Sequence, residues 1–127
     1  MRAAGVSLLL FAALTASAAA GTYSTSGVQS AATEGLQCAV SNVGTAPVNV
    51  TVALFDVFGA PVSAGVSDTC VAGFAGVLPA GVTCGAAYAG ALYARCTVTA
   101  SNSRIRAALS VLDSTGRMTL SVPATKR

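Results

Sequence analysis

The sequence contains 127 residues, of which 54% are hydrophobic and 9% are charged, and its formal net charge is +3. Its seven basic residues are scattered, so the chain lacks the basic stripe that nucleic-acid binding requires. Histidine is absent, which removes the commonest general base and a common metal ligand from its chemistry.

The first twenty residues have the pattern of a signal peptide. MRAAG carries one arginine, VSLLLFAAL is apolar, and TASAAA supplies the small residues that a signal peptidase accepts. We expect cleavage after Ala20, with Ala18 as the alternative. The apolar stretch 6–20 is shorter than the ~20 residues of a membrane-spanning helix, so we expect no membrane span after cleavage. Removing Arg2 leaves six basic residues against four acidic ones, a net charge of +2, on a secreted or periplasmic protein.

Residues 21–35 are small and polar, which predicts a flexible lead-in or an edge strand around Tyr23–Val28. Beyond them, apolar and polar residues alternate in segments that are separated by turns rich in Gly, Pro, Asn and Ser, as in β-strands. In the last of these segments the alternation predicts that Met118, Leu120 and Val122 point inward. Residues 125–127 form a basic tail. The expected strands cover residues 36–43, 48–57, 62–67, 92–100, 104–113 and 117–124.

These strands predict an all-β fold, in which residues 36–124 form a single Ig-like antiparallel β-sandwich of about seven strands. One face of each strand is apolar, and the other is rich in Thr and Ser. The alanine-rich segment 86–94 has helical propensity, but Gly85 and Gly90 interrupt it. We therefore expect no helix after the signal peptide.

Four cysteines, an even number in a small exported chain, predict two disulfides. No C-x-x-C motif occurs among Cys38, Cys70, Cys84 and Cys96, so we expect no metal site. Three pairings are possible. Cys38 and Cys96 each fall on the apolar face of a strand, which favours a bond between them through the core and pairs Cys70 with Cys84.

Four segments carry a resemblance: CAVSNVGTAPVNVTVALFDVFG (38–59), LPAGVTC (78–84), YARCTV (93–98) and RAALSVLD (106–113). The chain resembles small secreted bacterial proteins of uncharacterised function. It is more loosely similar to the Ig-like cell-adhesion-related modules called CARDB. It departs from these modules in its extra cysteines and in lacking their closing acidic, asparagine-rich run. The resemblance implies an Ig-like sandwich and adds little about function.

The segment between Cys70 and Cys84 is glycine-rich, and no charged residue occurs from residue 69 to residue 94. We interpret it as a loop or hairpin stapled by a disulfide. Binding loops on rigid sandwiches are common, so this loop is a candidate interaction site. The alternative is that Phe74 and Leu78 pack back onto the core. The apolar tip would consist of Phe74, Val77, Leu78 and Pro79.

Catalytic groups are few. The acids of the mature chain are Glu34, Asp56, Asp68 and Asp113, and no pattern brings two of them together. Asp56 and Asp113 each precede a turn, where aspartate caps backbone N–H groups. The sequence therefore predicts no enzyme, no catalytic residue and no cofactor.

The sequence predicts a non-catalytic module that interacts with an unknown protein or cell-surface partner, or has a structural role. The alternative is a secreted protease inhibitor or binding protein that uses the 70–84 loop. Asn49-Val50-Thr51 has the form of a glycosylation sequon, which we interpret as an ordinary exposed strand position.

Overall fold

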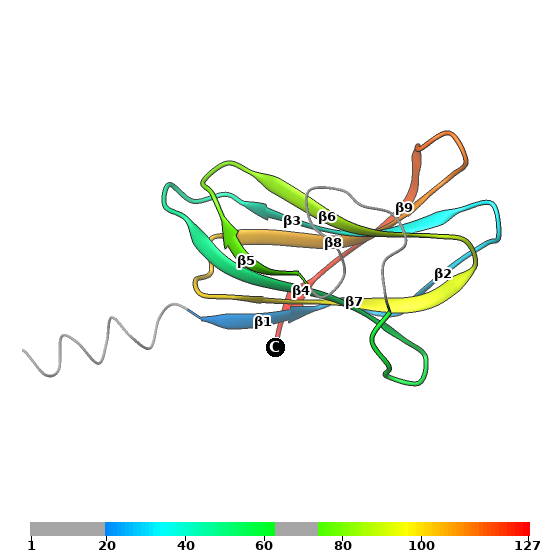
Figure 1. The fold of residues 1–127 in the computed structure, drawn as a ribbon, viewed down its shortest axis with the longest axis horizontal. Helices are drawn as coiled ribbons and strands as arrows, with labels where there is room; N and C mark the ends of the chain where they lie inside the picture. Colours follow the sequence, from blue (N-terminus) through cyan, green and yellow to red (C-terminus); the bar gives the residue numbers. More distant parts are fainter. Residues whose placement is uncertain (1–19, 63–73) are drawn as a thin grey trace, which may run out of the picture.

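The computed structural model describes residues 20–62 and 74–127 of the chain. Ten strands form two antiparallel sheets that pack face to face as a β-sandwich (Figure 1). No helix that is long and apolar enough to cross a membrane occurs in these two ranges. The strands are β1 Gly21–Ser24, β2 Val28–Ser30, β3 Gly35–Asn42, β4 Val48–Asp56, β5 Phe74–Leu78, β6 Thr83–Ala89, β7 Leu92–Ala100, β8 Ile105–Leu112, β9 Met118–Pro123 and β10 Thr125–Lys126.

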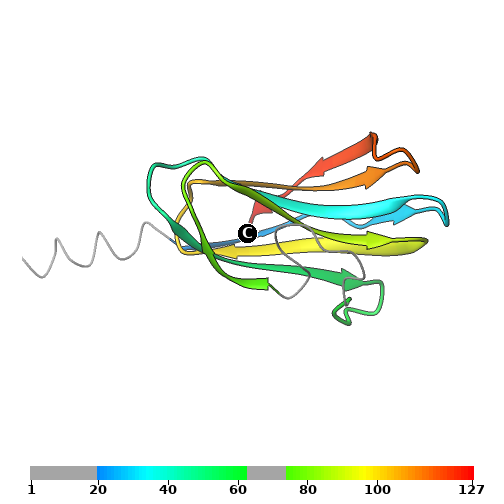
Figure 2. The same ribbon diagram turned by 45° about the horizontal axis from the view of Figure 1, so that its top comes forward.

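The first sheet has the order β10-β1-β7-β4-β5, with β2 also pairing with β7, and the second has the order β6-β3-β8-β9 (Figure 2). Two long pairs lie at the centre, β4 with β7 and β3 with β8. The prediction of an all-β sandwich is confirmed. The chain has ten described strands rather than about seven, because β5 and β6 form where no strand was expected, residues 21–30 hold two short strands, and β10 follows the last expected strand.

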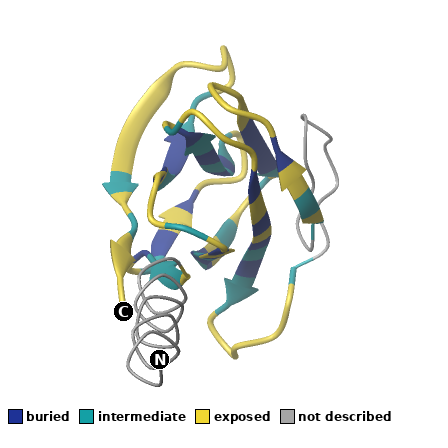
Figure 3. Ribbon diagram, turned by 90° about the vertical axis from the view of Figure 1, so that its left-hand side faces the viewer, coloured by how far each residue is buried: buried dark blue, intermediate teal, exposed yellow. Residues whose placement is uncertain are grey.

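Alternation of apolar and polar residues places the core between the two sheets. In β3 the burial alternates along the whole strand, and Leu36, Cys38 and Val40 are fully buried. In β4 the buried residues Val50 and Val52 face the core, and the threonine between them faces solvent. Figure 3 shows the same striping of buried and exposed positions along the ribbon. Period-two alternation is a local property, so these faces follow directly from the sequence.

A disulfide joins Cys38 in β3 to Cys96 in β7, with 5.8 Å between their Cα atoms. It links one sheet to the other through the core, as the sequence predicts, because both cysteines lie on inward-facing positions. Cys84 is buried in β6 and is also disulfide-bonded. Cys70 lies outside the described residues, so the predicted Cys70–Cys84 pair remains a prediction.

Residues 21–35 contain two short strands, which agrees with the edge-strand alternative rather than with a flexible lead-in. Both pair with β7: β1 with its second half and β2 with its first residues. β1 in turn pairs with β10, so that Tyr23 lies opposite Lys126. The residues that we expected as a basic tail therefore include an edge strand. This pairing joins residues about a hundred positions apart, which local patterns cannot reveal.

The prediction that three residues of β9 point inward is wrong for Met118. Leu120 pairs with Val111, but Met118 pairs with Leu112, because a β-bulge shifts the register between these pairs. One extra residue moves every following side chain to the other face of the sheet. Met118 is 56% exposed as a result. Leu120 keeps its inward register but is 50% exposed at the sheet edge, whereas Val122 packs against the core.

Two other expectations can be compared with the structure in part. The predicted strand 62–67 lies almost wholly outside the described residues; only Val62 is described, and it packs against the core. The alanine-rich segment 86–94 contains the end of β6, a turn and the start of β7, and it crosses from one sheet to the other. Gly90 in its turn has a φ of +110°, a conformation that favours glycine.

Asn42 is a buried polar residue that the sequence analysis did not single out. Its Nδ2 donates to the backbone oxygens of Ala46 (2.9 Å) and Leu78 (3.0 Å), and its Oδ1 accepts from Gly44 N (2.9 Å). The side chain thus ties the turn after β3 to the end of β5, and all its polar atoms are satisfied, as burial requires.

Candidate functional site

The predicted apolar tip of the 70–84 loop does not form as one surface. Residues 74–78 form the strand β5, which pairs with β4. Phe74 packs against the core, and Leu78 is only 3% exposed. Val77 is 60% exposed, and Pro79 is exposed in the turn that follows. The alternation along β5 separates the four candidates, so only Val77 and Pro79 face solvent.

Two acidic residues, Asp56 and Asp113, cap turns with their side chains. Asp56 Oδ1 accepts hydrogen bonds from Phe58 N and Ala60 N, both at 2.9 Å. Asp113 Oδ1 accepts from Thr115 N and Arg117 N, also at 2.9 Å. The turn role predicted for these two residues agrees with these bonds. Asp68 lies outside the described residues.

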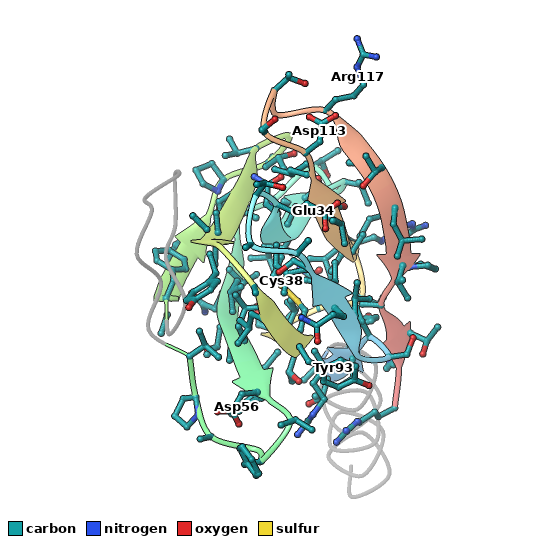
Figure 4. All side chains as sticks on the ribbon, turned by 90° about the vertical axis from the view of Figure 1, so that its right-hand side faces the viewer. Glu34, Cys38, Asp56, Tyr93, Asp113 and Arg117 are labelled. Atoms are coloured by element: carbon teal, nitrogen blue, oxygen red, sulfur yellow. A yellow bond between two sulfur atoms is a disulfide. The ribbon has the colours of Figure 1, made fainter. Side chains whose placement is uncertain are left out.

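Two of the acids lie closer together than the sequence suggested. Gly35 pairs with Leu112, so Glu34 and Asp113 occupy the next opposed positions, at the ends of β3 and β8. Figure 4 shows both at the same end of the sandwich. Glu34 Oε1 accepts from Ala31 N at 2.7 Å, so this carboxylate also caps a turn. Residues 20–62 and 74–127 hold no group of three or more potential metal ligands.

The two aspartate turns have the same hydrogen-bond pattern. In each, the aspartate N–H donates to the backbone oxygen four residues later (Ala60 or Arg117), at 2.9 Å. The glycine three residues after the aspartate has a positive φ, +79° at Gly59 and +80° at Gly116. Both sequences, DVFG and DSTG, read D-x-x-G, which is typical of a type I turn closed by a left-handed glycine. This repeated motif is a signal that the sequence analysis could have used.

The turns differ in what they expose. The positions between aspartate and glycine are Ser114 and Thr115 in one turn, and Val57 and Phe58 in the other. Val57 is 64% exposed and Phe58 is 90% exposed. Since the second turn forms with two polar residues at the same positions, the turn itself does not require apolar ones. We call residues 56–61 the apolar turn.

Beside the apolar turn, an arginine side chain lies over an aromatic ring. Arg95 in β7 pairs with Phe55 in β4, and its guanidinium carbon is 5.1 Å from the centroid of the Phe55 ring. This distance is within the range of cation–π attraction. Tyr93, two residues earlier, lies on the same outer face and is partly exposed. A Cβ atom at Gly27 would collide with the Tyr93 hydroxyl, so the glycine leaves room for this ring.

The ladder places these features at one corner of the molecule. Asp56 pairs with Ala94, so the apolar turn starts where the β4–β7 ladder ends, beside Tyr93. Figure 4 shows Asp56 and Tyr93 in the same lower part of that end of the sandwich. We define the aromatic corner as Phe55, Val57, Phe58, Tyr93 and Arg95. The sequence analysis did not find it, because cross-strand neighbours 40 residues apart are not visible locally.

Three hollows lie on the described surface, and the smallest, of about 250 Å³, is lined by residues 43–46 with Asn102 and Arg104. The other two are larger. One, of about 350 Å³, lies at the far end of the first sheet and is lined in part by Asn49, Thr51 and Thr99. The other, of about 320 Å³, includes Glu34, Asp113 and Tyr88. Both acids in the second hollow are engaged in turn hydrogen bonds.

The crystal structure of Thermotoga maritima 1070 is similar to this chain, with a TM-score of 0.50 and 10% sequence identity. The likeness covers 87% of this chain and 95% of that one. At this identity it shows a shared fold and nothing about activity. No protein-family model and no curated protein matches the chain.

Proposed function

We propose that this protein is an exported, non-catalytic interaction module that contacts a protein partner through the aromatic corner. The observation that carries the proposal is the 90% exposure of Phe58 on a turn that hydrogen bonds hold in place. Exposed aromatic residues on rigid supports are typical anchors of protein interfaces. A preformed turn loses little conformational freedom when it binds.

The comparison of the two turns supports a role for the apolar residues outside folding. Ser114 and Thr115 occupy the positions of Val57 and Phe58 in a turn of the same pattern. Exposed apolar side chains gain nothing from burial in the isolated protein. Burial of these side chains against a partner would remove their apolar surface from water, which is favourable.

Two observations of different kinds support export. The Cys38–Cys96 disulfide favours an oxidising, extracytoplasmic compartment. The pattern of residues 1–20 supports a signal peptide, with cleavage after Ala20. In this proposal the mature domain is an Ig-like module with a second disulfide, Cys70–Cys84, and functions in the periplasm or outside the cell. Its relatives would be the small secreted bacterial proteins and, more loosely, the CARDB modules.

The protease-inhibitor alternative has less support. An inhibitor loop presents adjacent side chains to the enzyme, whereas β5 turns Phe74 and Leu78 toward the core. The described acids cap turns, which gives the enzyme alternative less support from their carboxylates.

Photo-crosslinking in the native host tests the proposal. A benzoyl-phenylalanine at position 58 is expected to give a discrete adduct with one exported protein. The control is the same probe at Val43, which is 54% exposed in the turn between β3 and β4. Equal adducts from both positions, or none from position 58, would refute the proposal.

A matched variant keeps the turn intact. Val57→Ser with Phe58→Thr reproduces the residues of the second turn, so it should fold normally. We expect affinity-tagged protein carrying this double substitution to lose the partner that crosslinks at position 58. Retention of that partner by the double variant would place the interface elsewhere.

A further inference from the structure

We propose that Arg95 binds a carboxylate of the partner that covers Phe58, so that the partner segment combines an apolar side with an acidic residue. This inference rests on the proposed function and adds the chemistry of the partner. It comes from the way the fold holds the arginine.

The aromatic ring of Phe55 holds the guanidinium group of Arg95 in a fixed position before any partner binds. Phe55 and Arg95 are direct cross-strand neighbours, and the guanidinium carbon is 5.1 Å from the ring centroid. The N–H donors of a guanidinium group lie in its own plane, as a fork of fixed geometry. Two of these donors together match the two oxygens of a carboxylate.

The charge of Arg95 has no acidic counterpart in the described structure. No ion pair joins it to any acid in residues 20–62 or 74–127. The outward-facing residues of β4 and β7 are otherwise uncharged. Asp56, the neighbouring acid in the ladder, accepts hydrogen bonds from Phe58 N and Ala60 N in the apolar turn, and no ion pair joins it to Arg95. An acidic group on a partner complements this pattern.

The same pattern argues against a lipid surface as the partner. Stable attachment to anionic lipids uses a cluster of four to eight basic residues or a lipid anchor. The aromatic corner has one cation. A bidentate arginine–carboxylate contact needs only one, and it adds orientation to the apolar contact of Phe58.

A selection from random peptides tests this inference. The probe is a phage-displayed library of random dodecapeptides, selected on the exported protein with its disulfides intact. We expect the selected peptides to be enriched in Asp or Glu next to apolar residues. Arg95→Gln should remove the acidic enrichment and weaken the selected peptides at least about tenfold, the loss typical of a charged hydrogen bond. The control Arg106→Gln, at an exposed position on the other sheet, should select the same peptides as the wild type.

The variants separate the two proposals. If Val57→Ser/Phe58→Thr abolishes peptide binding and Arg95→Gln does not change it, the carboxylate inference is wrong and the proposed function stands. If neither variant changes the selected peptides, both are wrong. Sedimentation with vesicles of neutral and of anionic phospholipid tests whether the partner is a lipid surface. Binding to vesicles that depends on Phe58, with no peptide selected, would overturn the inference in favour of a lipid partner.

Discussion

Cys38 and Cys96 are fully buried at the centre of facing sheets, and their disulfide closes a loop with a sequence separation of 58. A crosslink of this length removes about 4 kcal/mol of unfolded-state entropy in the chain-entropy model. The double substitution Cys38→Ala/Cys96→Ala should lower the free energy of unfolding by about that amount, measured by urea denaturation. A loss below about 1 kcal/mol would show that packing, rather than the crosslink, holds the two sheets together.

The Asn42 side chain gives a second stability prediction. Asn42→Ala deletes three hydrogen bonds and leaves the buried carbonyl of Leu78 without its donor. Unsatisfied buried groups are costly, so we expect a loss of about 3 kcal/mol in the free energy of unfolding. Asn102→Ala is the control, because Asn102 Oδ1 accepts a single bond, from Arg104 N, in an exposed turn. Equal effects of the two substitutions would contradict the role assigned to Asn42.

The edge position of β9 predicts different costs for two leucines that both face inward. Leu109 is fully buried in β8, whereas Leu120 is 50% exposed in β9. Leu109→Ala should lower the free energy of unfolding by about 3 kcal/mol, as large-to-small core changes do. Leu120→Ala should cost less than about 1.5 kcal/mol, because it removes half-exposed surface. If urea denaturation gives the same loss in the free energy of unfolding for both variants, the Leu120 side chain must be more buried than its 50% exposure indicates.

Asp113 makes stability depend on pH at the acidic end. The Thr115 hydroxyl, followed by the N–H of Arg117, holds the pKa of this carboxyl below its ordinary value of 3.8. A depressed folded-state pKa contributes stability above the unfolded-state pKa, and this contribution is lost as the pH falls through the folded-state pKa. Thr115→Ala should therefore be less stable than the wild type at neutral pH, and the gap should narrow below pH 3.8. Thermal unfolding across this range measures the gap; Thr115→Ser keeps the hydroxyl and should follow the wild type.

The apolar turn should be dispensable for folding. Val57→Ser/Phe58→Thr replaces two exposed side chains with the residues of the equivalent turn, so its free energy of unfolding should stay within about 0.5 kcal/mol of the wild type. Its solubility should rise, because an exposed apolar patch is removed. A large loss of stability would mean that Phe58 packs against the domain, and would remove the basis of the proposed interface.

The sequence by itself determined the features that depend on local periodicity. Alternation in 36–43 and 92–100 predicted the inner faces of two central strands, and with them the Cys38–Cys96 bond. Asp56 and Asp113 were recognised as turn caps because the capped N–H groups lie within four residues. A side chain's face and a short-range hydrogen bond are both set by neighbouring residues.

Only the tertiary structure decided the features that depend on distant pairing. It placed β10 beside β1, turned Met118 outward through a bulge, and separated Val77 from Phe74 and Leu78. It also laid Arg95 on Phe55 beside the apolar turn. Local patterns predict which residues can be buried, but which strand covers them depends on contacts across the whole chain. The exposure of Phe58, on which the proposed function rests, was therefore decided by the fold.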